Sequence, residues 1–565
     1  MTPSTGARIT RWARRMVQAS CLALFVWLFL AAAFKLSGLS DAALGSFFYS
    51  DPLIALGTWA SSRAVGGLLL FACATIVATL ALGRVFCGWI CPLGTIHAAA
   101  SVWRRAKPMV LARTESWSKR QRVKYYLLAA FMGMALFGGH WFGLFDPLSL
   151  LYRTLTASLG PGVQHAIKAG TTAVFQADPH VGPVRLAAVT EPIYRFSRDR
   201  VFGEGQQSYE GGFFILALFA AIVLLNLFRK RFWCRYICPL GALLGLLAKR
   251  PLLQRICAKD RCTNCALCRL DCQGGAIPDR ATQWMPSECF MCMNCGAACD
   301  AQAIRFAFAS PFKPQPGPKL DLGKRAMLTA GAAGVAGMIG MRLPPLARGD
   351  LFHPALIRPP GALAEPAFLA RCIQCGLCMK VCPTNGLQPT LFEAGLEGLW
   401  TPRLAPKIGE CEYECNRCGQ ACPTHAIEPL PLEKKKEVRI GLAAFDVSRC
   451  LPYAYGRECL VCEEHCPTPK KAIYFIEVDV PLRGGGTRRL KQPRVDTDLC
   501  IGCGACERKC VFVDVAAIRV TSANETRHPK NQPMLAGSQE LLPPWNSPQD
   551  ASGGASLSDP YANPY

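Results

Sequence analysis

Cysteine spacing constrains this chain more than any other feature of its sequence. Twenty-four of the 31 cysteines fall into six runs of four. Four runs have the spacing C-x2-C-x2-C-x3-C, and the other two widen only the first gap. This spacing is typical of cubane iron–sulfur sites, which need four thiolates each, so the runs predict six 4Fe–4S clusters. The runs are Cys262, Cys265, Cys268 and Cys272; Cys289, Cys292, Cys295 and Cys299; Cys372, Cys375, Cys378 and Cys382; Cys411, Cys415, Cys418 and Cys422; Cys450, Cys459, Cys462 and Cys466; and Cys500, Cys503, Cys506 and Cys510.

Disulfides and zinc are the alternatives for so many cysteines. A disulfide framework has no need for three closely spaced cysteines followed by a delayed fourth. A structural zinc site takes two C-x2-C pairs, which would leave the third cysteine of each run unused. The pattern therefore favours iron–sulfur clusters, and six one-electron centres favour an electron-transfer function.

The composition changes along the chain. The first ~250 residues are apolar and poor in cysteine, whereas the remainder is rich in cysteine and proline. The formal net charge is +24, a balance that can indicate nucleic-acid binding. Here the early basic residues lie beside apolar segments, which favours a membrane partner and no nucleic acid.

Four apolar stretches are long enough to cross a bilayer, at 16–36, 65–86, 125–145 and 212–228. Buried helices of a soluble domain are the alternative for each. Because few charges interrupt the stretches, we predict a four-span α-helical membrane domain over residues 1–250.

The four predicted spans form two tandem repeats of two helices. An Asp-Pro-Leu turn follows the first and third spans, beginning at Asp51 and Asp146. A C-x3-C-P-L-G motif ends the second and fourth spans. These motif cysteines are Cys87, Cys91, Cys234 and Cys238. They could converge on one additional metal or cluster, form two redox-active dithiols, or serve only in packing.

The distribution of basic residues predicts the topology. Lys and Arg collect on cytoplasmic loops, and here they cluster before the first span, between the second and third, and after the fourth. Only Arg63 is basic within 37–63. Both C-x3-C-P motifs are therefore expected at the cytoplasmic surface of the membrane and both Asp-Pro-Leu turns at the periplasmic surface.

Residues 251–310 contain the first two cysteine runs and predict an α+β, bacterial-ferredoxin-like domain in the cytoplasm. In two-cluster domains the fourth cysteine of each run binds the other cluster. This rule pairs Cys299 with the run that begins at Cys262, and Cys272 with the run that begins at Cys289.

A linker and a helix are expected at 311–345. The weakly apolar stretch 326–341 follows Lys324 and Arg325 and resembles a twin-arginine export signal. It predicts a fifth span, with a surface helix as the alternative. A four-cluster domain at 346–520 and a disordered tail at 521–565 would then be periplasmic.

The motifs resemble two known families. Residues 1–310 resemble the NapH type of membrane quinol dehydrogenase, with its four spans, two C-x3-C-P motifs and two C-terminal cluster motifs. Residues 320–520 resemble the NapG/MauM-type exported polyferredoxin, through the runs that begin at Cys372, Cys450 and Cys500. The chain therefore looks like a fusion of the two.

The resemblance implies quinol oxidation at the bacterial inner membrane and electron delivery to a periplasmic reductase or c-type cytochrome. Asp51, Asp146 and His140 are candidates for taking protons from quinol. Helix capping is the alternative role of the two aspartates, and a satisfied interfacial position that of His140. Similar membrane modules occur in accessory proteins of nitrous-oxide reductase and in maturation factors of cytochrome oxidase. The alternative function is therefore a maturation factor that supplies electrons for assembly or reactivation of a partner metalloenzyme.

Overall fold

The computed structural model divides the chain into two compact units. Unit 1 comprises Met1–His353, Arg358–Leu404 and Asn416–Lys435, and unit 2 comprises Pro354–Ile357, Ala405–Cys415 and Lys436–Tyr565. The described residues are 5–32, 40–64, 66–103, 115–178, 180–181, 184–202, 205, 207–312, 318, 320–343, 353–481 and 486–532. The predicted four-cluster region 346–520 thus contributes residues to both units.

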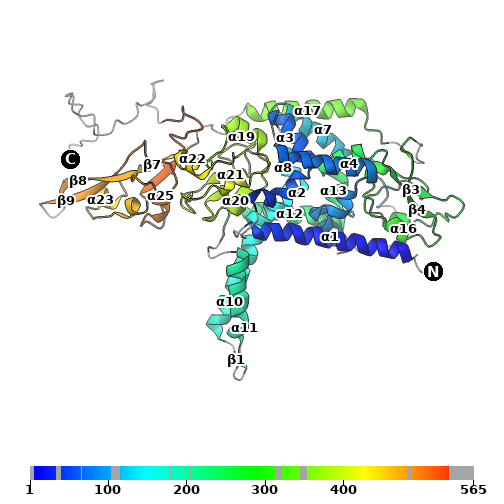
Figure 1. Cartoon of the computed structure of the whole chain (residues 1–565), viewed down its shortest axis with the longest axis horizontal. Coiled ribbons are helices and arrows are strands. Elements are labelled where there is room, and N and C mark those ends of the chain that lie inside the picture. Colours follow the sequence, from blue (N-terminus) through cyan, green and yellow to red (C-terminus); the bar gives the residue numbers. More distant parts are fainter. Residues whose placement is uncertain are drawn as a thin grey trace. The chain divides into compact units, whose positions relative to one another are not determined.

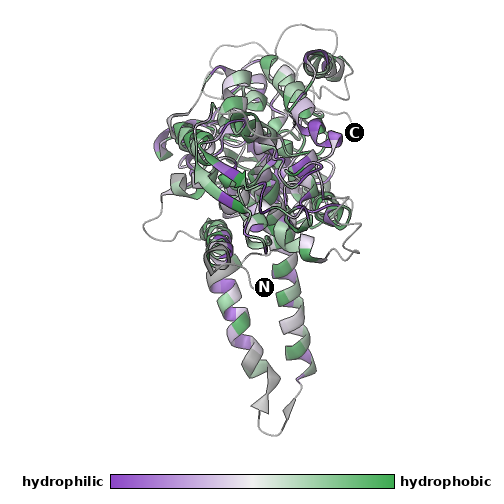
Figure 2. Cartoon of the chain, turned by 90° about the vertical axis from the view of Figure 1, so that its right-hand side faces the viewer, coloured by the Kyte–Doolittle hydropathy of each residue, from purple (hydrophilic) through white to green (hydrophobic). Residues whose placement is uncertain are grey.

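Helices build the first 250 residues of unit 1 (Figure 1). They are α1 (Thr5–Ala31), α2 (Ser46–Tyr49), α3 (Pro52–Ser62), α4 (Ala72–Leu82), α5 (Pro92–Ala100), α7 (Val123–Leu136), α8 (Phe142–Phe145), α9 (Pro147–Thr154), α10 (Gly160–Ala177), α11 (Leu186–Ser197), α12 (Gly212–Leu224), α13 (Phe232–Tyr236) and α14 (Pro239–Leu247). The short strands β1 (His180–Val181) and β2 (Val184–Arg185) join α10 to α11. These two helices project from the rest of unit 1 as a hairpin with mixed polar and apolar residues (Figure 2).

Only part of the predicted membrane domain has the length of a span. Among the described residues, Ile9–Ala31 alone is both long and apolar enough to cross a membrane. Leu69–Leu82 and Gly212–Leu227 are apolar but shorter, and α7 has 14 residues, fewer than the about 20 that a bilayer core needs. One such helix is weak support, so the four-span domain stays a prediction.

The two repeats begin their helices in the same way. Asp51 caps α3, where its Oδ1 accepts from Leu53 N at 2.7 Å, and Asp146 caps α9, where its Oδ2 accepts from Ser149 N at 2.7 Å. Proline occupies the first helical position in both cases. Aspartate followed by proline is a strong helix start because the side chain satisfies a free N–H and the proline ring presets φ.

Helix α17 (Lys324–Arg342) packs closely on α7 through small residues. A Cβ atom on Gly334 would lie 2.0 Å from the carbonyl oxygen of Ala130, and one on Gly133 would lie 2.4 Å from that of Gly331. Glycine at these positions lets the two backbones approach, as at helix interfaces in membranes.

The two helices run in the same direction. Tyr126 Oη, early in α7, donates to Leu322 O at 2.9 Å, just before α17 begins. Arg342 Nη1, at the end of α17, donates to Phe137 O at 3.1 Å, just past the end of α7. α17 therefore ends at the same end of the bundle as α7.

Two cysteine-rich segments complete unit 1. Each contains one antiparallel strand pair, accompanied by two short helices in the first segment and three in the second. The first segment has β3 (Leu253–Cys257), α15 (Leu267–Leu270), α16 (Asn294–Ala297) and β4 (Ile304–Phe308), and the second has α19 (Glu365–Arg371), α20 (Leu377–Val381), β5 (Leu387–Pro389), β6 (Pro402–Leu404) and α21 (Arg417–Gln420). α22 (Leu432–Glu437) follows in the chain.

Unit 2 is built from two antiparallel strand pairs and short helices. β7 (Leu442–Phe445) pairs with β10 (Ile518–Thr521), and β8 (Ile473–Pro481) pairs with β9 (Thr487–Val495). The helices are α23 (Leu451–Ala454), α24 (Val461–Glu464) and α25 (Ala505–Lys509). This mixture of strand pairs and single-turn helices matches the predicted α+β class of the iron–sulfur regions.

The tail is partly folded. Asn531 is buried, and its Nδ2 donates to Ser522 O at 2.9 Å and to Glu525 Oε1 at 3.2 Å. Residues up to 532 therefore pack within unit 2, although disorder was predicted from 521. Residues 533–565 lie outside the described part of the chain.

Candidate iron–sulfur sites and the buried polar layer

Three cavities are each lined by four cysteines, three from one run and one from the neighbouring run. Each has a volume of about 340 Å³, including space open to solvent. In unit 1 the first is lined by Cys289, Cys292, Cys295 and Cys272, and the second by Cys372, Cys375, Cys378 and Cys422. The third, in unit 2, is lined by Cys500, Cys503, Cys506 and Cys466.

These donor sets fit cubane clusters better than single metal ions. Among the described residues, no three His, Cys, Asp or Glu side chains converge closely enough to hold one ion. Four thiols around a cavity, with the fourth supplied by another run, match the ligand pattern of two-cluster ferredoxins. Burial raises the pKa of the Cys289, Cys372 and Cys503 thiols to about 12. At neutral pH the thiolate form therefore depends on a bound cation.

The other cysteine runs are only partly brought together. Burial raises the pKa of Cys268 to about 11, and Cys265 and Cys299 are among the neighbouring thiols. In unit 2, burial and the nearby Cys459 and Cys510 raise the pKa of Cys450 to about 12. Both neighbourhoods contain the fourth cysteine of the adjacent run.

The remaining run cysteines are distributed between the units. Cys262 lies beside Cys257 in unit 1, and Cys462 lies beside Cys450 in unit 2. Unit 1 also contains Cys382 and Cys418, and unit 2 also contains Cys411 and Cys415.

The C-x3-C-P cysteines of both repeats lie close to one another inside unit 1. Cys91 neighbours Cys234 and Cys87, and Cys238 neighbours all three of the others. Their exposed fractions are 9%, 6%, 8% and 4% for Cys87, Cys91, Cys234 and Cys238. The tandem repeat thus brings four thiols from distant sequence positions to one buried place.

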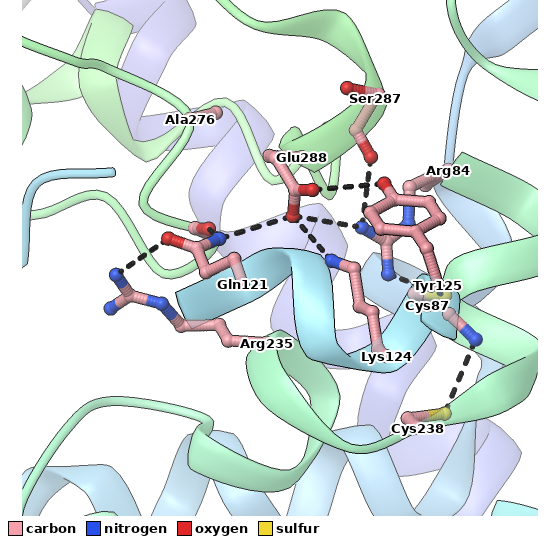
Figure 3. Close-up of polar contacts among 12 residues, drawn as sticks. Arg84, Cys87, Gln121, Lys124, Tyr125, Arg235, Cys238, Ala276, Ser287 and Glu288 are labelled. Atoms are coloured by element: carbon pink, nitrogen blue, oxygen red, sulfur yellow. Dashed lines mark hydrogen bonds and ion pairs between the residues drawn. The ribbon is translucent and has the colours of Figure 1, made fainter. Parts of the chain in front are cut away.

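A buried carboxylate beside this layer was not singled out in the sequence. Glu288 is 1% exposed and accepts hydrogen bonds from Tyr125 Oη at 2.9 Å and Gln121 Nε2 at 3.1 Å (Figure 3). It also pairs with Lys124 and, at 3.8 Å, with Arg84. Glu288 directly precedes Cys289, so this network joins the bundle to the first cysteine-rich segment. The signal in the sequence is a lone glutamate beside a cluster motif.

At the other end of the bundle, Asp51 and Asp146 face each other. Both are fully buried, and their carboxyl groups lie within interaction distance. One oxygen of each caps a helix, whereas Asp51 Oδ2 and Asp146 Oδ1 have no hydrogen-bond donor among the described residues. His140 lies elsewhere, with its Nε2 3.2 Å from Thr58 Oγ1. The structure therefore pairs the two aspartates and places His140 against α3.

Arg153 connects the aspartate pair to the second cysteine-rich segment. It is fully buried, interacts electrostatically with Asp146, Cys375 and Cys372, and its Nη1 donates to Gln374 O at 2.9 Å. Its guanidinium lies 4.6 Å from the centre of the Trp400 ring. The sequence signal for this position is that Arg153 is the one charged residue of α9.

Comparison with known families supports 4Fe-4S binding in several parts of the chain. A 4Fe-4S binding domain model matches residues 64–109 and 212–257, and another model of that description matches 493–510. A 4Fe-4S dicluster domain model matches residues 371–427. No solved structure matches the chain.

Curated relatives identify the family. The methylamine utilization ferredoxin-type protein MauM of Methylorubrum extorquens is 38% identical over 203 residues, which are 35% of this chain and 88% of the relative. The ferredoxin-type protein NapG of Escherichia coli is 33% identical over 209 residues, which are 37% of this chain and 87% of the relative. This chain belongs to the NapG/MauM family of ferredoxin-type proteins.

Membership in the NapG/MauM family makes the chain a ferredoxin-type iron–sulfur electron-transfer protein. The ferredoxin-type protein MauN of Methylorubrum extorquens is also similar, at 28% identity over 260 residues, 45% of this chain and 71% of the relative. The NapH-type half of the predicted fusion stays a prediction.

Proposed function

We propose that this protein is a membrane-bound quinol dehydrogenase component that passes electrons through 4Fe–4S clusters to a periplasmic reductase or c-type cytochrome. The observation that carries the proposal is the arrangement of unit 1, in which cysteine-rich segments contact both ends of one helical bundle (Figure 1). At the start of α7, Lys124 pairs with Glu288 of the first segment. Beyond its end, a Cβ atom on Gly143 would lie 2.3 Å from Ile373 O of the second segment.

The direction of α17 supports opposite compartments for the two segments. Lys and Arg concentrate at the end that carries the C-x3-C-P motifs, which favours the cytoplasm for residues 251–310. α17 runs parallel to α7 and ends on the side of the Asp-Pro-Leu turns. Residues after Arg342 therefore begin on the periplasmic side of a multi-pass inner-membrane protein.

Quinol oxidation needs neighbouring acceptors for two protons and two electrons. Burial raises the pKa of both Asp51 and Asp146, and the nearby Asp146 raises that of Asp51 further, so this carboxyl pair favours holding a proton. Arg153 lies between Asp146 and the cysteines of the second segment. Proton acceptors and electron acceptors are thus adjacent at the periplasmic end, and His140 is a further proton candidate beside Thr58.

The 24 run cysteines would hold six 4Fe–4S clusters. Each cluster supplies one reversible one-electron step when bound. The residues themselves provide thiolate donors and a shell that limits water access, since Cys268, Cys292, Cys378, Cys462 and Cys506 are all buried.

Quinol oxidation by the purified protein in lipid nanodiscs, with an artificial electron acceptor, tests the function. Asn keeps the helix cap at Asp51 and Asp146 but accepts no proton. D51N and D146N should therefore lower turnover by about 100-fold or more, with iron content unchanged. D199N, at a surface carboxylate paired with Arg198, is the matched control and should keep full turnover. Normal turnover in D51N and D146N would exclude the proton role, and no turnover in iron-replete wild-type protein would favour the maturation-factor alternative.

A further inference from the structure

The C-x3-C-P cysteines of the two repeats form one buried set of four thiols. Each 4Fe-4S binding domain match, at 64–109 and 212–257, contains only one motif pair. A cubane needs four thiolates, so one pair is insufficient and two pairs are sufficient. We propose that Cys87, Cys91, Cys234 and Cys238 hold a seventh 4Fe–4S cluster, shared between the repeats. The proposal deepens the function proposed above and rests on it only for the direction of electron flow.

The hydrogen bonds around these thiols resemble those of the ferredoxin-type sites. Gly94 N donates to Cys91 Sγ at 3.4 Å, and Gly241 N donates to Cys238 Sγ at 3.2 Å. In the first cysteine-rich segment, Ala276 N donates in the same way to Cys272 Sγ at 3.3 Å. N–H donors to sulfur tune the potential of iron–sulfur clusters, and here they come from equivalent positions of the two repeats.

Two buried arginines supply positive charge next to the thiols. Arg84 and Arg231 occupy equivalent positions, three residues before the first motif cysteine of each repeat. Arg84 Nη2 lies 3.9 Å from Cys87 Sγ, and Arg231 Nη1 donates to Cys87 O at 2.8 Å. Both side chains are fully buried, yet Nε and Nη2 of Arg231 have no hydrogen-bond partner within the described part of the chain. Unpaired buried N–H groups are costly, and an anionic cluster would satisfy them.

The wider charge balance also favours an anion. Among the residues that the structure describes, buried cations near the motifs outnumber the buried carboxylates beside them. The cations are Arg84, Lys124, Arg231 and Arg235, and the carboxylates are Glu115 and Glu288. A cubane with four thiolates carries about two negative charges when oxidised, which offsets this excess.

The two alternatives for these four cysteines, a single metal ion and a pair of dithiols active in thiol exchange, fit the structure less well than a cluster does. The thiols do not converge on one ion, and the same holds for the cysteine sets of the three ferredoxin-type cavities. Thiol exchange with a partner requires access, whereas none of the four cysteines exceeds 9% exposure. A multi-iron cluster tolerates both the spacing and the burial.

The shared site would lie directly against the first cysteine-rich segment. The guanidinium groups of Arg84 and Arg231 lie 4.7 and 5.1 Å from the Phe290 ring centre, and Phe290 sits between Cys289 and Cys292. A Cβ atom on Gly88 would lie 2.0 Å from Phe290 O. An electron on the shared cluster could therefore reach the site of Cys289 and Cys292 over a short distance.

Iron counting in pair variants tests whether the site exists and whether it is shared. Wild-type protein should contain about 28 irons and an equal amount of sulfide per chain. C87S/C91S, C234S/C238S and the quadruple variant should each lose about four irons, because either pair alone is insufficient. C73S is the control, since Cys73 is exposed within the same matched range, and it should lose none.

Two results would overturn the proposal. One is full iron content in the quadruple variant, and the other is pair losses that add up to the quadruple loss, which indicates two separate sites. R231Q provides a readout if the cysteine variants fold poorly. This variant should keep all iron but lower the reduction potential of one cluster. The potentials are measured in a redox titration monitored by electron paramagnetic resonance. An unchanged set of potentials would contradict the proposed site. Iron content is independent of quinol turnover, so failure of the proposed function would be recognised separately.

Discussion

At the residue scale, partners from distant parts of the chain determine what each ionisable side chain does. Glu288 is held by Lys124, Tyr125 and Gln121, more than 160 positions away. The fourth cysteine of each described cavity likewise comes from another run. Replacing one of these residues therefore leaves a buried charge without its partner, or a cluster site without one of its four thiols.

Cys422 should serve the cluster of the Cys372 run. Because Cys422 lines the cavity of Cys372, Cys375 and Cys378, C372A and C422A should each lose the same electron paramagnetic resonance signal and about four irons. The double variant should lose no more iron than either single variant, because the effects of replacing two ligands of the same cluster are not additive. C21A is the control. Additive losses would mean that the two cysteines bind different clusters.

Replacing Glu288 should destabilise unit 1 strongly. In E288Q the buried Lys124 and Arg84 lose their carboxylate, and breaking a buried pair typically costs about 3–5 kcal/mol. We expect a clear fall in the midpoint of thermal unfolding, measured by tryptophan fluorescence. E191Q removes an exposed pair with Arg195 and should cost less than about 1 kcal/mol. Equal midpoints for the two variants would contradict the central role of Glu288.

At the element scale, the repeats share helix starts but differ where they meet other segments. Asp51 and Asp146 cap equivalent helices, and Cys91 and Cys238 accept equivalent N–H bonds. Gly88 of the first repeat makes room for the Phe290 carbonyl. Arg235, its counterpart in the second repeat, pairs instead with Glu115 at 2.6 Å. Both repeats therefore contact the first cysteine-rich segment, the first through a close backbone approach and the second through buried charged side chains such as Lys124.

Packing of α17 on α7 should depend on one glycine. In G334L the side chain would meet the Ala130 carbonyl, since a Cβ atom already lies 2.0 Å away. We expect separation of the two helices and faster protease cleavage near residues 320–343. G340L is the matched control because, among the described residues outside its own helical turn, no atom would lie within 4 Å of a Cβ atom at Gly340. Equal cleavage of the two variants would show that this contact does not hold α17.

At the scale of the whole molecule, compact units and predicted domains do not coincide. Unit 1 contains the predicted membrane domain, the first ferredoxin-like domain and part of the four-cluster region. The chain leaves unit 1 after His353 and returns to it with Arg358–Leu404. Such a return places cluster motifs from both halves of the sequence in one unit.

Reporter fusions should place the two halves in different compartments. A fusion after Ser310 should be active only in the cytoplasm, because basic loops hold that end inside. A fusion after Asp350 should be active only in the periplasm, because α17 runs parallel to α7. A fusion after Pro251 is an internal control for the cytoplasmic side. Cytoplasmic activity at both Ser310 and Asp350 would reject periplasmic delivery by this chain.

The sequence by itself determined the features that depend on short spacings. Six cysteine runs, two C-x3-C-P motifs and two Asp-Pro turns are local patterns, so ligand type and helix starts follow from residues a few positions apart, and the repeat follows from the recurrence of these patterns. Only the tertiary structure decided the roles of Arg153, Glu288 and Arg231, which gain their significance from partners more than 140 positions away. The physical reason is burial. A charged side chain removed from water needs a partner of opposite charge or a hydrogen-bonding group, and the tertiary fold determines which distant residue supplies it. The same reason explains why four thiols from two separate repeats meet in one place.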